Sequence, residues 1–337
     1  MAMTGPELAV GGRRDDRAVA AVSPALDTGI DTVVCIPSFR RPTNLRKTLE
    51  SLAAQRAARR FAVVVVENDA AKSESVPVAA EFLRTSLHGL CVVEPRQGNV
   101  HAINAAFETA RESFPLAVNF LMIDDDEIAS PGWLDAMLRA ADTSGADIVG
   151  GPVWPDFDDA LKCGLRNHPA FAPAYDASGP VPVIYGSGNC LIRRSVFERL
   201  AEPSFDLRFN LLGGGDTDFF WRCREAGMKF HWVAEAVINE TVPPGRTSLR
   251  WLAARGLRIG AINYHVQRKV APNAWSRFAL TLKMLAALPL SLLRAFRLAL
   301  TAHKATVAMH PMTVAVGSAL AAIGIEPQPY KASKIVP

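Results

Sequence analysis

The chain has few cysteines, and none of them is paired in sequence. Its 337 residues contain five Cys, at positions 35, 91, 163, 190 and 223, and no CxxC motif. An odd number of widely spaced thiols argues against a disulfide framework and against a zinc site, and it favours a reducing cytoplasm. Excess charge is also scarce, because a formal net charge of +4 is too small to indicate a nucleic-acid partner.

Two kinds of motif are absent as well. The first 30 residues mix Arg13, Asp15 and Arg17 with Gly, Ala and Pro, and they contain no long apolar stretch. We therefore expect a poorly ordered extension over residues 1–30 rather than a signal peptide. No GxGxxG follows a predicted strand and no GxxxxGK[ST] occurs, so a dinucleotide-binding fold and a P-loop lack support.

Four consecutive acids are the most informative feature that the chain does have. The apolar run Phe120–Ile123 ends in Asp124, Asp125, Asp126 and Glu127. Adjacent carboxylates repel one another, so a turn of this kind calls for cations or hydrogen-bond donors. At the carboxyl end of a buried strand they would lie where α/β sheets bind ligands, and hard oxygens suit Mg²⁺ or Mn²⁺. The alternative is a solvated turn that caps a helix over 133–141.

The segments before this turn alternate between strand and helix patterns. Residues 32–36, 61–66 and 90–93 are short β-branched runs, and helices are predicted from Thr43 or Asn44 and over about 100–112. Such alternation predicts an α/β fold, with a mostly parallel sheet flanked by helices. Residues 150–186 are rich in Pro, Gly and aromatics, which favours irregular chain and a mobile flap.

Polar clusters follow each of these strands. They are Pro37-Ser38, Glu67-Asn68-Asp69, Arg96-Gln97-Gly98-Asn99 and Asp124 to Glu127. Carboxylate and amide groups can bind a base and ribose, Arg96 can neutralise phosphate, and the acidic turn can hold a cation. Loops are polar in any protein, but four clusters in succession favour a nucleotide site.

Several of these segments resemble a known family. IPSFRRPTNLRKTLESL, VVVVENDA, RQGNVHAINAAF and IDDDEIASPGWL are similar, in this order, to the successive motifs of family 2 glycosyltransferases. The resemblance covers about residues 30–260. It implies a GT-A-type, Rossmann-like fold, a nucleotide-sugar donor, a divalent cation held by a DxD motif, and inversion at the anomeric carbon.

The resemblance also assigns residues. Asp124 and Asp126 match the DxD metal ligands, and Glu240 stands in the region where the family often has a His ligand. Glu67 replaces a more common Asp. The donor site implied by the resemblance comprises Pro37, Ser38, Arg40, Glu67, Asp69, Arg96, Asn99, Asn104, Asp124, Asp125, Gly188, Asn189 and Arg246.

The segment GGGDTDFFWR resembles the family's ED motif, whose Asp acts as general base on the acceptor hydroxyl. By position Asp216 is that base, Gly215 replaces the usual Glu, and Asp218 is expected to bond helix backbone or acceptor. An ordinary N-cap is the alternative for either Asp. The sequence Thr247-Ser248-Leu249-Arg250-Trp251 lacks the Gln of the QxxRW motif of processive synthases, which favours the addition of single sugars.

The C-terminal region changes character. Residues 278–300 are Leu- and Ala-rich but are interrupted by Lys283, Pro289, Arg294 and Arg297, whereas a membrane span wants about 20 uninterrupted apolar residues. Together with the weakly apolar stretch 305–325, this predicts a pair of interfacial helices in peripheral contact with a membrane. A soluble helical cap and a homodimer interface are the alternatives.

These observations define one hypothesis. Residues 31–265 form a GT-A catalytic domain, with a nucleotide-sugar half (31–145) and an acceptor half (146–265), followed by a helical region over 266–337. The protein is expected at the cytoplasmic face of the inner membrane. It would transfer one hexose, with glucose from UDP-glucose favoured, to a glycan or lipid-linked acceptor, using Mg²⁺ or Mn²⁺. A nucleotidyltransferase is one alternative, although IPSFRRPTNL fits a phosphate loop poorly. A non-catalytic carbohydrate-binding protein is the other, because of Gly215.

Overall fold

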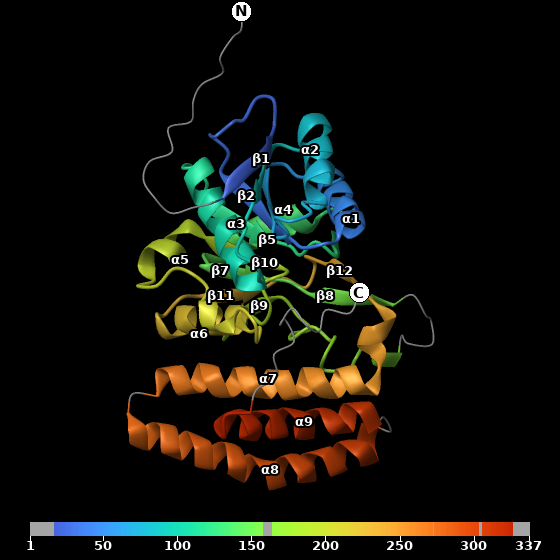
Figure 1. Cartoon of the computed structure of the whole chain (residues 1–337), viewed down its shortest axis with the longest axis vertical. Coiled ribbons are helices and arrows are strands. Elements are labelled where there is room, and N and C mark those ends of the chain that lie inside the picture. Colours follow the sequence, from blue (N-terminus) through green and yellow to red (C-terminus); the bar gives the residue numbers. More distant parts are fainter. Residues whose placement is uncertain (1–16, 158–163, 272, 303–304, 326–337) are drawn as a thin grey trace, which may run out of the picture.

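The computed structural model describes residues 17–157, 164–271, 273–302 and 305–325. An α/β body lies above a layer of three long helices (Figure 1). The main sheet has the strand order β1-β4-β3-β2-β5-β10-β7-β11-β9. Its strands are β1 (Ala18–Val22), β2 (Thr32–Ser38), β3 (Ala62–Glu67), β4 (Gly89–Val93), β5 (Asn119–Met122), β7 (Ile148–Gly150), β9 (Gly179–Val181), β10 (Cys190–Arg193) and β11 (Phe230–Trp232).

The central strands are buried on both faces. β4, β3, β2 and β5 run parallel to one another, and every residue of β2 and β3 is buried. Successive residues point to opposite core layers: Val33 and Cys35 pack toward α3, while Val34 and Ile36 pack toward α1 and α4. β-Branched residues suit this arrangement because both faces of a parallel sheet are covered by helices.

Helices cover both faces of the sheet. α1, α2 and α4 share one apolar cluster, and α3, α5 and α6 share the other. The bounds are α1 (Pro42–Ala53), α2 (Ser75–Thr85), α3 (Asn99–Ser113), α4 (Trp133–Ser144), α5 (Arg194–Arg199) and α6 (Gly215–Glu225). The expected α/β fold with a mostly parallel central sheet is confirmed, as are the strands over 32–36, 61–66 and 90–93 and the helix over about 100–112.

A second, three-stranded sheet carries the end of the acidic turn. Its order is β6-β12-β8, with β6 (Glu127–Ala129), β12 (Ile238–Val242) and β8 (Val153–Phe157). The region 150–186, expected to be irregular, thus contributes the short strands β8 and β9, while residues 158–163 lie outside the described chain. The described residues also include the 3-10 helices η2 (Leu207–Phe209) and η3 (Pro244–Thr247).

The N-terminal expectation is wrong for residues 17–30. β1 pairs antiparallel with β4 and extends the main sheet. Arg17 holds this strand in place, because its guanidinium donates to Ala105 O, Thr109 Oγ1 and Glu108 Oε2 on α3. Residues 1–16 lie outside the described chain.

The C-terminal layer consists of α7 (Leu249–Val270), α8 (Ala274–Ala302) and α9 (Ala305–Ala322). α9 lies between α7 and α8 and packs against both, while α7 also contacts α6 (Figure 1). Ser318 Oγ of α9 donates to Gly260 O of α7 at 2.9 Å, which indicates close backbone approach. α7 runs unbroken through position 265, so the expected domain boundary falls inside a helix, and the layer begins near residue 249.

Candidate active site

The polar ends of β2 and β5 meet directly. Ser38 Oγ and the backbone N–H of Phe39 both donate to Asp125 Oδ2, at 3.0 and 3.1 Å. Ser38 also bonds Ser75 Oγ, at the start of α2. Asp125 is buried, so its carboxylate ties the strand ends together. Pro37 lies buried within β2, next to Val66 of β3.

Two more carboxylates, Glu67 and Asp69, lie at and just after the end of β3. Arg40 Nε donates to Asp69 Oδ2 at 2.6 Å, and this bond holds the pKa of Asp69 below its usual value. Arg40 has a φ of 54°, a left-handed conformation that is uncommon outside glycine and tends to occur at functional sites. Both oxygens of Glu67 accept backbone N–H groups, from Asp69 and Ser75, so Glu67 shapes this loop.

The loop after β4 is fixed by Glu94, which the sequence did not point to, and by Asn68, which was predicted only as part of a polar cluster. Buried Glu94 pairs with Arg96 through two guanidinium–carboxylate bonds of 2.8 Å. Asn68 donates to the carbonyls of Glu94 and Arg96 and accepts from the N–H of Gly98. Arg96 is therefore held at the rim by a carboxylate. The side chain of Asn99 is exposed at the start of α3.

Three carboxyl groups of the acidic turn have pKa values raised above their usual range. Burial, and then the charges of Asp126 and Asp125, raise the pKa of Asp124 to about 8. Burial raises the pKa of Asp125 to about 6, although Arg41 lowers it. Burial and Asp124 raise the pKa of Glu127 well above its usual value. Like charges in a low-dielectric setting favour protonation or a bound cation.

A guanidinium supplies part of that positive charge. Arg41 Nη1 donates to Asp125 Oδ1 at 3.1 Å and to Asp126 Oδ2 at 2.6 Å. Arg41 directly precedes α1 and lies in the motif IPSFRRP, yet the sequence analysis did not assign it. Arg41 lies between the end of β2 and Pro42, the first residue of α1. From there its guanidinium group reaches the acidic turn that follows β5.

Glu127 packs between the turn and β10. Its Oε2 accepts the N–H of Asp124 at 2.7 Å, and a Cβ placed on Gly188 would lie 2.5 Å from its Oε1. Gly188, which the resemblance places in the donor site, thus closely approaches a carboxylate of the chain itself. Across the β6–β12 pair, Glu127 is opposite Glu240, whose Oε1 accepts from Arg246 Nη1 at 2.6 Å. Burial raises the pKa of Glu240, while Arg246 lowers it.

A Gly188→Ala substitution should therefore disturb the acidic turn. We expect overpacking against Glu127 to cost about 1–3 kcal/mol of unfolding free energy and to weaken nucleotide-sugar turnover. Gly132→Ala is the matched control, because a Cβ there meets nothing within 4 Å, and it should cost less than about 1 kcal/mol. Denaturant unfolding measures the loss of unfolding free energy in each variant. Equal losses in the two variants would show that the contact with Glu127 is not what requires glycine.

The carboxylates can be tested for their fit to a divalent cation. Within the described ranges, no three His, Cys, Asp or Glu side chains are arranged to enclose a metal ion. Asp124, Asp126 and Glu240 nevertheless act on one another electrostatically. Mg²⁺ usually takes one or two carboxylates and completes its shell with water and substrate phosphates. Asp124 and Asp126 fit that pattern, with Arg41 as the competing cation.

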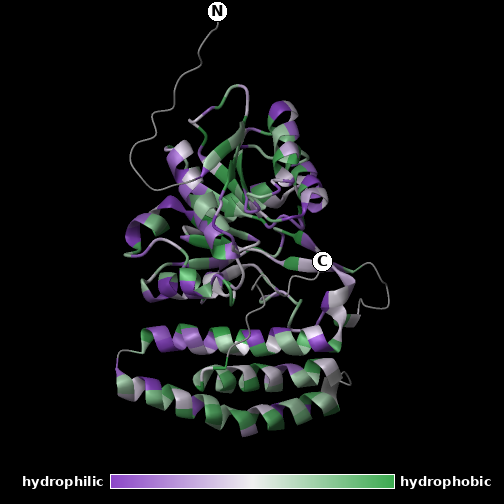
Figure 2. Cartoon of the chain, in the orientation of Figure 1, coloured by the Kyte–Doolittle hydropathy of each residue, from purple (hydrophilic) through white to green (hydrophobic). Residues whose placement is uncertain are grey.

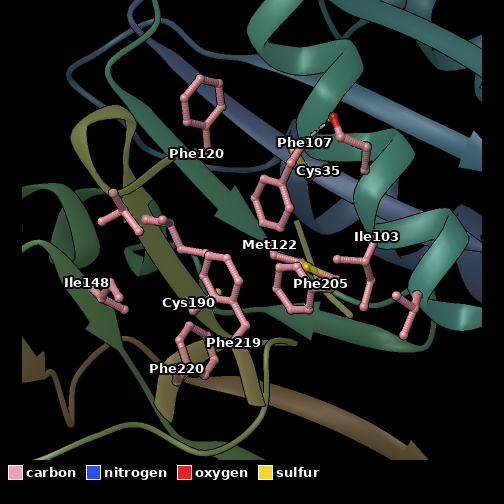
Figure 3. Close-up of a cluster of buried hydrophobic side chains, with 14 of the residues drawn as sticks. Cys35, Ile103, Phe107, Phe120, Met122, Ile148, Cys190, Phe205, Phe219 and Phe220 are labelled. Atoms are coloured by element: carbon pink, nitrogen blue, oxygen red, sulfur yellow. Dashed lines mark hydrogen bonds between the residues drawn. The ribbon is translucent and has the colours of Figure 1, made fainter. Parts of the chain in front are cut away.

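α6 places Asp216 within electrostatic reach of Cys190, which pairs with Met122 at the end of β5. Phe219 and Phe220 anchor this helix in the core, where Phe219 stacks on Phe205 with ring centroids 4.3 Å apart (Figure 3). Burial raises the pKa of the Cys190 thiol, and the charges of Asp124, Asp216 and Glu127 add to that effect. Asp216 and the acidic turn therefore lie within electrostatic reach of one thiol.

The two aspartates of α6 have different surroundings. Asp216 is only partly buried, and its Oδ1 accepts the N–H of Thr217. Asp218 is buried and pairs with Arg222 Nε at 2.8 Å and with Lys269 Nζ at 2.9 Å. This differs from the expectation that Asp218 bonds helix backbone or acceptor, because two cations occupy its carboxylate.

Two other residues predicted to bind the nucleotide sugar use their side-chain amides for hydrogen bonds within the protein. Asn104 exchanges two hydrogen bonds with the backbone of Phe205. Asn189 accepts from Trp133 Nε1 and donates to the carbonyls of Pro152 and Ala236. These two side chains connect the segments around the site. Their contacts with a nucleotide-sugar donor stay a prediction.

The acidic turn and the strand ends around it lie in a part of the chain that is similar to known proteins. A family model described as glycosyl transferase family 2 matches residues 33–201. The chain belongs to this family and is a glycosyltransferase. It is 34% identical over 235 residues to the succinoglycan biosynthesis protein ExoM of Rhizobium meliloti (strain 1021), covering 68% of this chain and 72% of that protein.

Other relatives are more distant. The O-antigen biosynthesis protein RfbC of Myxococcus xanthus is 26% identical over 222 residues, which cover 60% of this chain and 16% of that protein. The mannosyltransferase PcManGT of Pyrobaculum calidifontis, solved with GDP-Man and Mn²⁺, has a TM-score of 0.56 at 18% identity, covering 90% of this chain and 89% of that one. TarS 1-349 of S. aureus, solved with UDP-GlcNAc, has a TM-score of 0.51 at 13% identity, covering 88% and 93%. At these identities the two structures support the fold alone.

Proposed function

We propose that this chain transfers a single hexose, with inversion, from a nucleotide sugar to a glycan or lipid-linked saccharide. The observation that carries the proposal is that Ser38, at the end of β2, donates to Asp125 of the acidic turn, and that Arg40 pairs with Asp69 just after β3. Asp216 lies within electrostatic reach of Cys190, which Asp124 and Glu127 also influence. The relative named for succinoglycan biosynthesis supports an acceptor that is a growing polysaccharide. UDP-glucose is the donor that we favour.

The nucleoside is proposed to bind over the ends of β2, β3 and β4. Pro37, Ser38 and the Arg40–Asp69 pair would form the floor of this part of the site, and Arg96 its rim. Arg246, which lies next to Glu240, would turn toward the diphosphate when that anion arrives, because a guanidinium suits two phosphate oxygens.

The cation proposed to accompany the donor would be held by Asp124 and Asp126, with Glu240 nearby. When bound, Mg²⁺ or Mn²⁺ supplies positive charge to the departing diphosphate. That role accords with the cation in the mannosyltransferase complex. Arg41 keeps the carboxylates partly neutralised until the donor binds. Asp216 would then accept the proton of the acceptor hydroxyl as the sugar–oxygen bond forms.

The site of action is proposed to be the cytoplasmic face of a membrane, where a lipid-linked acceptor is displayed. In the domain division that we propose, residues 31–145 serve the donor and 146–248 the acceptor. The helical layer that starts at α7 carries the chain's most basic stretch, with no Asp or Glu between Thr241 and Ile325.

A donor panel tests this proposal. UDP-glucose, UDP-galactose, UDP-GlcNAc and GDP-mannose are each incubated with the protein in Mg²⁺, Mn²⁺ or EDTA, with and without a lipid-linked saccharide extract. We expect nucleoside diphosphate release from UDP-glucose that EDTA abolishes. In Asp126→Ala, donor affinity should fall about tenfold or more, because a charge-assisted contact is lost.

Asp176→Ala serves as the matched control, because this aspartate is exposed and lies outside the site. It should release diphosphate at the wild-type rate. Release of pyrophosphate instead would identify a nucleotidyltransferase. Tight nucleotide-sugar binding without release from any donor, in the presence of acceptor, would identify a binding protein and defeat the proposal.

A further inference from the structure

The solvent-facing side of α8 is apolar. Along this helix Trp275, Phe278, Leu282, Leu285, Leu293 and Phe296 follow the period of an α-helix, and between 41% and 75% of the surface of each is exposed. These six residues are called here the outer face of α8. Figure 2 shows hydrophobic colouring along much of the helix. A soluble protein rarely exposes an apolar stripe of this length, so the stripe calls for a partner.

The opposite side of α8 is already in use. Leu280 and Met284 are buried in the main hydrophobic core cluster, which also contains Ala321 of α9. α8 packs along α9, and α9 packs along α7. Of the three helices in the layer, α8 lies farthest from the α/β body (Figure 1), and the residues of its outer face are exposed to solvent. It is the reverse of the usual amphipathic helix, whose outward side is polar.

The charge around this face selects the partner. The segment from Thr241 to Ile325 contains eleven Lys and Arg and no Asp or Glu. Four of them, Arg277, Lys283, Arg294 and Arg297, lie on α8, and all four are exposed. Two copies of this chain would bring like charges together, whereas the headgroups of anionic lipids attract them.

We propose that the outer face of α8 binds the surface of an anionic bilayer, with the helix axis parallel to the membrane plane. Aromatic and Leu side chains would enter the boundary between headgroups and acyl chains, and the flanking Arg and Lys would reach the phosphates. This places the glycosyltransferase at the surface where a lipid-linked acceptor would be found. In that respect the inference rests on the proposed function, but the binding itself requires no sugar chemistry.

The structure favours lying on the membrane over crossing it. By length and composition α8 could span a bilayer. Its most apolar 18-residue stretch has a mean hydropathy of 1.5, and only 11% of that stretch is buried. At about 1.5 Å per residue its 29 residues extend over about 43 Å. Spanning would, however, strip Leu280 and Met284 from the core or carry charged α7 into lipid. A helix in the interface keeps every contact seen here.

Vesicle sedimentation tests the proposal with the full chain. Wild type should sediment with vesicles that contain 30% phosphatidylglycerol and remain largely in the supernatant with pure phosphatidylcholine. Binding should weaken in 0.5 M salt, because surface charges are then screened. Phe278→Glu/Phe296→Glu should lower the partition coefficient about 100-fold or more, since two large apolar side chains no longer enter lipid.

Leu116→Glu/Val118→Glu is the matched control. It makes the same chemical change at two exposed apolar positions of the α/β body and should bind vesicles within about threefold of the wild type. The α8 variant should keep the wild-type thermal midpoint and the wild-type rate of nucleotide-sugar hydrolysis without vesicles. Failure of this inference is thereby distinguishable from failure of the proposed function.

Three results would overturn the proposal. The first is equal binding of wild type and the α8 variant to anionic vesicles. The second is a dimer of the wild type, split by Phe278→Glu/Phe296→Glu, with no vesicle binding, which would assign the face to a second copy. The third is retention of the bound protein after washing with alkaline carbonate, which would indicate that α8 spans the bilayer.

Discussion

Asp216→Asn should lower the kcat of glycosyl transfer by about 10²- to 10⁴-fold, the usual contribution of a positioned base. Asn keeps the shape of the side chain, and its amide oxygen can still accept from the Thr217 N–H. What disappears is the ability to take a proton from the attacking hydroxyl. Because Asp216 lies in α6 and the donor is proposed to bind over β2 and β3, the Kd for the nucleotide should stay within about twofold of the wild type.

The measurement pairs single-turnover transfer with calorimetric titration of UDP in Mn²⁺. Asp176→Asn makes the same chemical change at an exposed position outside the site and serves as the reference. A kcat for Asp216→Asn within tenfold of wild type would remove Asp216 from the role of base. A large loss of nucleotide affinity would place it in the donor site instead.

The strands and helices that carry this site could be predicted from the sequence, because each of them has a local pattern of apolar residues. The runs that end at Ile36, Val66 and Val93 are β-branched and continuous, and such runs fit a sheet buried on both faces. The topology of α/β units then brings the polar residues after each strand to one edge. The direct bond between Ser38 and Asp125 bears this out across 87 positions of sequence.

Pairing between side chains was harder to predict, because it depends on reach in three dimensions. The resemblance placed Arg40 in the donor site, but no local pattern shows that Arg40 contacts Asp69 while Arg41 contacts Asp125 and Asp126. The positive φ of Arg40 turns the two neighbouring guanidinium groups toward different strands. The partners of these two guanidinium groups are therefore known only from the fold.

Packing also explains a departure from the family pattern. Gly215 stands where the ED motif usually has Glu, and a Cβ there would lie 2.9 Å from Val100 Cγ2 on α3. A larger side chain would have to displace this contact. The close approach of α6 to α3 therefore accounts for glycine at this position without implying a degenerate site, and it leaves Asp216 as the first acid of the helix.

Asp218 was the hardest residue to place from sequence, since its partners lie in other elements. Its carboxylate connects α6 to Lys269 of α7, and Lys269 Nζ also contacts Asp206 Oδ2 at 2.7 Å. Arg222, one turn further along α6, donates to Oδ2 of the same carboxylate at 2.8 Å. This network joins the catalytic body to the helical layer, so the position of α7 and the position of Asp216 are set by the same helix.

Asp218→Asn should therefore reduce stability far more than it changes chemistry. Removing one member of a buried ion pair costs about 3–5 kcal/mol, and we expect about 3 because Lys269 retains Asp206. The apparent thermal midpoint should fall by roughly 5–10 °C. Differential scanning calorimetry measures this, with Asp176→Asn, an exposed aspartate, as the reference.

The paired variant separates this role from catalysis. Lys269→Met/Asp218→Asn removes the charge on both sides of this pair. It should recover part of the lost midpoint relative to Asp218→Asn, because the Lys269 ammonium no longer adds to the positive charge left beside Arg222. At 15 °C, where all variants are folded, Asp218→Asn should retain kcat within about tenfold of wild type, in contrast to Asp216→Asn. A stable Asp218→Asn protein with abolished transfer would instead make Asp218 the base, and Asp216 its neighbour.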